Sequence, residues 1–72
     1  MKLTIDNTAD ALYLTLSEVE IQETRQVAPG VMLDYDAEGK VVGVELLSIS
    51  KRAGKADLQR LLFETLGSAA ST

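Results

Sequence analysis

Apolar and polar residues alternate over much of the first 47 positions, which predicts short β-strands separated by turns. Leu3 and Ile5 alternate with polar residues, and so do the leucines at positions 12, 14 and 16. Pairing Ile5 with Leu12 also places Leu3 opposite Leu14, so both stretches present their apolar residues to one face. The pattern therefore predicts an antiparallel hairpin with strands at about residues 2–6 and 11–16.

Two turn signals divide the next part of the chain. Pro29 and Gly30 suit the two central positions of a type II turn, between strands at about residues 19–27 and 31–35. Glutamates and an arginine make the 19–27 stretch highly charged, which is typical of an edge strand.

A four-residue turn over 36–39 leads into a strand at about residues 40–47, with Gly39 in the left-handed conformation. In this register Tyr35 faces Lys40, Leu33 faces Val42 and Val31 faces Val44. The sequence thus predicts an antiparallel meander of four to five strands.

After residue 47 the apolar spacing becomes helical. Leu58, Leu61, Leu62 and Leu66 form a stripe that includes Thr65, which predicts one C-terminal α-helix at about residues 55–66. Asp57 or Ser50 would cap its start, and Gly67 would end it. We expect the stripe to pack on one face of the sheet, giving a single small α+β domain over residues 1–67. Residues 68–72 are expected to form a frayed tail.

Composition narrows the class of protein. With 46% hydrophobic and 25% charged residues, the 72-residue chain resembles an ordinary globular domain. It has no apolar run of about 20 residues and no apolar stretch typical of a signal peptide near its start, and zero cysteines suit a reducing compartment. A cytoplasmic location is therefore expected.

Charge bears on the kind of partner. Eleven acidic residues against seven basic ones give a net charge of -4, which disfavours nucleic-acid and membrane partners. Lys51, Arg52 and Lys55 form the one local basic spot.

The residue types leave few routes to catalysis. The chain has no histidine and no cysteine, so the commonest general base and zinc ligands are missing, and no catalytic residue or cofactor is predicted. Asp34, Asp36, Glu38 and Glu45 match part of a calcium-loop pattern. A hairpin would separate them, however: with Asp34 facing Val41, Glu45 would lie about 13 Å farther along.

An alternative groups Asp34 with Glu38-Gly39-Lys40 as the metal-dependent core of a nuclease. We interpret these residues first as turn residues, with metal binding as the alternative.

A set of short motifs resembles one family. The motifs are Asp6, Ala9-Asp10-Ala11-Leu12-Tyr13-Leu14, Thr24, Pro29-Gly30, Asp34-Tyr35-Asp36, Gly39 and Val42-Gly43-Val44-Glu45-Leu46-Leu47. Over residues 1–52 the chain is similar to the small bacterial proteins called domain of unknown function 2283. Asn7 replaces a typical proline, and Ile49 a more usual alanine. The resemblance implies a mostly-β domain in a bacterial cytoplasm, and it implies no activity or catalytic residue. The resemblance also suggests that the chain is a small regulatory or interaction module with a small protein partner.

The expected function is a non-enzymatic interaction module that forms a homodimer through the helix and a sheet face or edge. Phe63 points about 140° away from Leu58 on a helical wheel and falls outside the leucine stripe. The interface candidates are Phe63, Leu62, Leu66, Met32 and Tyr13. In the alternative arrangement, the sheet and the loop around Ile49 cover Phe63 within one chain. A divalent-metal-binding protein or metal-dependent enzyme using the 34–45 hairpin is the second hypothesis.

Overall fold

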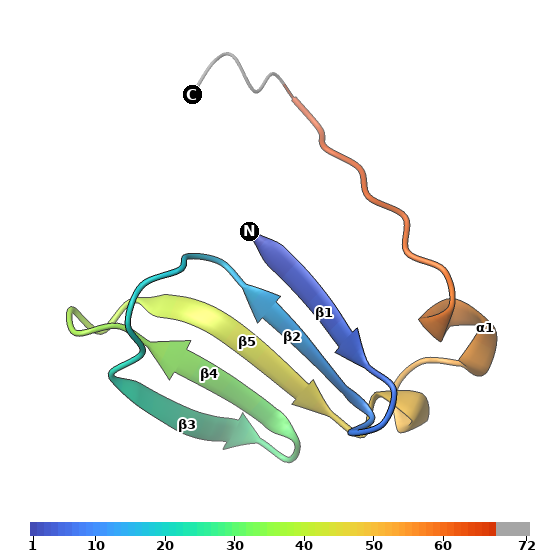
Figure 1. The fold of residues 1–72 in the computed structure, drawn as a ribbon, viewed down its shortest axis with the longest axis horizontal. Coiled ribbons are helices and arrows are strands. Elements are labelled where there is room, and N and C mark those ends of the chain that lie inside the picture. The colour runs from blue at the N-terminus through green and yellow to red at the C-terminus, as the bar shows by residue number, and fades with distance from the viewer. Residues whose placement is uncertain (68–72) are drawn as a thin grey trace.

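The computed structural model describes residues 1–67 and contains one five-stranded antiparallel sheet (Figure 1). Its elements are β1 (Lys2–Asp6), β2 (Ala11–Thr15), β3 (Glu23–Ala28), β4 (Val31–Tyr35), β5 (Val41–Leu47), a 3-10 helix η1 (Ile49–Lys51) and α1 (Lys55–Leu58). All five predicted strands are present, and only β3 differs by more than one residue, since it begins at Glu23 rather than near 19. The tail expected at 68–72 lies outside the described residues.

The strand order is β1-β2-β5-β4-β3, so the predicted meander is wrong. The chain between β2 and β3 passes the end of the sheet, and β5 rather than β3 lies beside β2 (Figure 1). The last four strands thus have a Greek-key order. The physical reason is that apolar β5 suits the centre, whereas all six residues of β3 are exposed. The edge position predicted for this charged strand is confirmed.

Register was predicted correctly in one hairpin and wrongly in the other. Ile5 pairs with Leu12 and Leu3 with Leu14, as expected. In the β4/β5 hairpin, Tyr35 pairs with Val41 instead of Lys40, and a register shift between Asp34 and Tyr35 displaces the pairing by a second residue, so Leu33 pairs with Val44 instead of Val42. The shift is two residues at Leu33, so its apolar partner stays on the same side of the sheet.

The pairing sorts the side chains onto two faces, since directly paired residues point the same way. The apolar face consists of Leu3, Ile5, Leu12, Leu14, Val31, Leu33, Tyr35, Val42, Val44 and Leu46. The polar face carries Thr4, Tyr13, Glu45, Met32, Asp34 and Thr24.

No second layer within residues 1–67 covers the apolar face, whose side chains are half-buried apart from exposed Leu3 and buried Val42. The buried hydrophobic residues are Ala11, Val42 and Ile49, and only Val42 among them belongs to the apolar face. The described chain is therefore a single-layer sheet with a short helical extension.

The helix predicted over 55–66 is present only as α1, and from Gln59 the chain extends away from the sheet (Figure 1). Gly54 is the N-cap and offers no side-chain bond, so neither Asp57 nor Ser50 caps the helix. Without a cap or a packed face, one turn is not propagated, because helix nucleation is costly. Gly67 is left-handed as expected, with φ 81°, but it follows no helix. No helix in the described part of the chain is long and apolar enough to span a bilayer.

Candidate functional site

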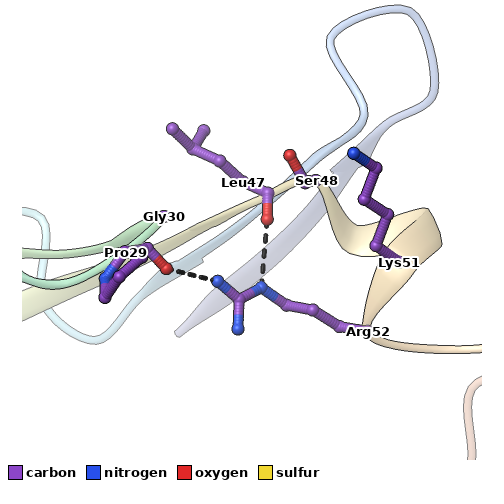
Figure 2. A pocket seen from close by; sticks show the side chains of 6 residues that line it. All are labelled: Pro29, Gly30, Leu47, Ser48, Lys51 and Arg52. Atoms are coloured by element: carbon purple, nitrogen blue, oxygen red, sulfur yellow. Dashed lines mark hydrogen bonds between the residues drawn. The ribbon is translucent and has the colours of Figure 1, made fainter.

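An open pocket of about 420 Å³ lies where the β3–β4 turn meets the end of β5 (Figure 2). Its lining residues are Pro29, Gly30, Leu47, Ser48, Lys51 and Arg52. Arg52 crosses the pocket: its Nε donates to the Leu47 carbonyl at 3.0 Å, and its Nη2 donates to the Pro29 carbonyl at 2.6 Å. The guanidinium therefore ties the turn to the end of β5.

The expected basic spot is divided by this arrangement. Figure 2 shows the Lys51 ammonium group on the opposite side of the pocket from the Arg52 guanidinium, which is turned toward backbone carbonyls. Because Arg52 makes charge-assisted bonds within the chain, its role here is structural. No motif in the sequence signals this contact, because it joins residues 23 positions apart.

A second long-range contact joins the β1–β2 turn to η1. Asp10 is left-handed, with φ 54°, and its carboxylate accepts the Ser50 N–H at 3.0 Å and the Ser50 hydroxyl at 2.7 Å. The Asp10 carbonyl also accepts the Ile49 N–H at 3.1 Å. These hydrogen bonds hold η1, which includes the buried Ile49, against the start of β2.

The acidic turn at 36–39 is organised by its own backbone. Asp36 Oδ1 accepts the N–H groups of Glu38 and Lys40, both at 2.9 Å. Lys40 Nζ lies 3.2 Å from Glu38 Oε2 and 3.9 Å from Asp36 Oδ2. Gly39 has φ 82°, so its predicted left-handed conformation is confirmed.

The other two metal candidates lie on the polar face. Asp34 Oδ1 accepts the Thr24 hydroxyl at 2.6 Å. Glu45 pairs with Tyr13, and the Glu45 charge is the main cause that raises the pKa of Tyr13, followed by burial. Asp34 pairs with Gly43 rather than Val41, so Glu45 lies two residues along, or about 7 Å, instead of the expected four. Within residues 1–67 no three acidic side chains gather where they would hold a metal ion.

The interface candidates fall into two groups. Leu62, Phe63 and Leu66 are highly exposed on the segment after α1, whereas Tyr13 and Met32 lie on the polar face. The structure does not bring the two groups together in one chain. Their role in an interface stays a prediction.

Sequence reasoning missed a polar border on the edge strand. Arg25 bonds Glu23 through Nε at 2.8 Å and lies over the Tyr35 ring, 5.4 Å from its centroid. The Arg25 hydrogen bond lowers the pKa of Glu23. The spacing of two residues, which puts Glu23 and Arg25 on one side of a strand, is the signal that would have found this pair.

A family model described as "Protein of unknown function (DUF2283)" matches residues 2–50. This range covers every strand of the sheet and ends within η1. The chain belongs to this family. The resemblance seen in the sequence motifs is thereby confirmed, and membership in DUF2283 assigns no activity. No curated protein and no solved structure gives a significant match. Residues 51–67, with α1 and the exposed leucines, lie outside the range matched by DUF2283.

Proposed function

We propose that this DUF2283 protein is a non-enzymatic interaction module that acts by self-association in the bacterial cytoplasm. The uncovered apolar face of the sheet carries this proposal. It spans four strands, and Val42 alone among its ten side chains is buried within the chain. Contiguous apolar surface of this kind marks a protein interface in a globular domain.

The surface area supports the same conclusion. The accessible surface of the chain is 5775 Å², whereas a compact monomer of 7.8 kDa exposes about 4,400 Å². Part of the excess belongs to the extended segment after α1. The excess of about 1,400 Å² is comparable with the surface that each subunit of a stable homodimer buries. A surface of this size is within the range that one further copy can bury.

Sedimentation equilibrium at micromolar concentration tests self-association. The expected result is a mass of twice 7.8 kDa or a larger multiple, and a mass of 7.8 kDa at all concentrations would contradict the proposal.

Two neighbouring substitutions on β1 provide a matched pair. Leu3→Lys places a charge on the apolar face, and Thr4→Lys places the same charge on the polar face, at positions exposed in the single chain. Leu3→Lys should shift the mass toward the monomer and Thr4→Lys should not. Equal behaviour of the two variants would place the interface elsewhere.

A further inference from the structure

The segment after α1 exposes a second apolar surface. We call residues 59–66 the C-terminal segment; its apolar side chains Leu61, Leu62, Phe63 and Leu66 are 66%, 75%, 77% and 87% exposed. In Figure 1 the segment leaves α1 and extends beyond β1, away from the sheet of its own chain. Two apolar surfaces of one chain, the segment and the apolar face, are thus uncovered at once.

We propose that the C-terminal segment of one copy packs on the apolar face of a second copy, and that the exchange is reciprocal. This inference rests on the proposed self-association and names its contact surface. Pairing two apolar faces directly would leave four large side chains of each segment in water. Reciprocal exchange covers both surfaces with one two-fold arrangement, which is the usual symmetry of a homodimer.

The lengths of the two surfaces match. The strands that form the apolar face have five to seven residues, or about 17 to 24 Å at 3.4 Å per residue. Eight residues of the segment span about 26 Å when extended. If the helix instead continues from Lys55 to Leu66 on docking, as the leucine spacing favours, its 12 residues span about 18 Å. Either conformation reaches across the face.

The charged side chains on β3, at the edge of the apolar face, also permit the C-terminal segment to dock on that face. On β3, the charged groups that share the side of the apolar face are Glu23 and Arg25, and they bond each other. Docking of Leu62 or Phe63 along the inner strands therefore leaves no strand charge buried without a partner, which would be costly.

Single cysteines test the contact, because the chain has none of its own. One full-length variant carries Phe63→Cys, and a second carries Leu14→Cys at the middle of β2 on the apolar face. Tyr13→Cys, the neighbouring position on the polar face, is the matched control. Phe63→Cys is mixed at about 10 μM with Leu14→Cys or, as the control, with Tyr13→Cys. Each mixture is treated with a short bismaleimide, which tolerates more geometries than a disulfide. Two cysteines that lie side by side in one dimer react at a millimolar effective concentration, about 100 times the 10 μM of the mixed variants. We therefore expect Phe63→Cys to crosslink to Leu14→Cys about 100-fold faster than to Tyr13→Cys.

Three outcomes would overturn the inference. Equal crosslinking to Leu14→Cys and Tyr13→Cys would mean that the segment does not choose the apolar face. Crosslinking only within one chain of a Leu14→Cys/Phe63→Cys double variant would mean that each chain covers its own face. Crosslinking of Leu14→Cys only to itself would indicate direct face-to-face pairing.

The native mass separates these failures from failure of the proposed function. A dimeric mass with any of the three results leaves self-association standing, whereas a monomeric native chain removes both proposals. Circular dichroism of each variant before crosslinking confirms that the strands are retained.

Discussion

Arg52 lies so close to Gly30 that a Cβ on Gly30 would come within 2.8 Å of the Arg52 Nη2 atom. Gly30 also has a φ of 71°, which an L-residue adopts only with strain. The Pro29-Gly30 turn thus depends on glycine for two separate reasons, the positive φ and the close approach of Arg52.

Gly30→Ala should destabilise the fold more than Gly39→Ala. Gly39 has a φ of 82° and open space around it, so alanine there adds only backbone strain of about 1 kcal/mol. At Gly30 the new methyl group also displaces Arg52 from the Pro29 carbonyl, which adds about 1.5 kcal/mol for a charged hydrogen bond. Urea unfolding measures both variants, and in an Arg52→Ala background the difference between them should disappear. Equal losses in the native background would contradict the role given to Arg52.

The Asp10–Ser50 contact should show energetic coupling. Asp10→Asn keeps a residue type that tolerates the left-handed conformation but weakens both bonds to Ser50. Ser50→Ala removes only the hydroxyl. We expect each change to cost about 1 kcal/mol of unfolding free energy and the double variant to cost less than their sum. Exact additivity in the denaturation cycle would show that the two side chains act independently.

The pKa of Tyr13 should fall when Glu45 is neutralised. The Glu45 charge holds the pKa of Tyr13 above its ordinary value of 10.0, so Glu45→Gln should lower it. Phenolate absorbance reports Tyr13 alone in a Tyr35→Phe background, because Tyr13 and Tyr35 are the chain's two tyrosines. An unchanged titration midpoint in Glu45→Gln would show that the carboxylate does not act on the phenol.

The same shift predicts the sign of a stability change at alkaline pH. A raised pKa means that the native state keeps the Tyr13 proton at a pH where the unfolded chain has lost it. The stability that this retained proton contributes is therefore fully present below the pKa of Tyr13 in the unfolded chain. It decreases as the pH rises through the pKa of Tyr13 in the native state. Stability measured by urea unfolding should fall less steeply over this range in Glu45→Gln than in the native chain.

Divalent cations should leave the melting temperature unchanged. Asp36 accepts two backbone bonds, Glu38 pairs with Lys40, and Asp34 bonds Thr24, so binding an ion would require these contacts to break. A ligand at 100 times its Kd stabilises a fold by about 2.7 kcal/mol, which is a large shift for a domain of this size. Thermal melts with Ca²⁺, Mg²⁺ and Mn²⁺ provide the measurement, with Asp34→Asn as the control. A stabilisation that this variant abolishes would favour the metal hypothesis.

Local patterns in the sequence predicted the local structure of this protein well. The strands follow from alternation, and the left-handed glycines at 30 and 39 follow from turn chemistry. The β1/β2 register follows from matching Leu3 and Ile5 to Leu14 and Leu12, because a hairpin needs only neighbouring residues.

Non-local features were not accessible in the same way. The pairing of Tyr13 with Glu45 depends on which strand lies beside β2. Every candidate strand shows the same alternation of apolar and polar residues, so this pattern does not identify the neighbour. The register shift beside Tyr35 comes from a bulge that no residue type signals. The leucine spacing of 58–66 indicates a helix only where the leucine stripe packs on a surface, and in the described chain these side chains stay exposed.

The placement of β5 between β2 and β4 also constrains the route of folding. The β1–β2 hairpin and the β3–β4–β5 unit each close through short connections, whereas Ala11 meets Leu47 and Thr15 meets Gly43 across about half of the chain. Closing the longer loop costs more entropy and gains contacts only at the end. The two units should therefore form early as separate pieces, and the β2–β5 seam should be the step that completes the sheet and limits its rate.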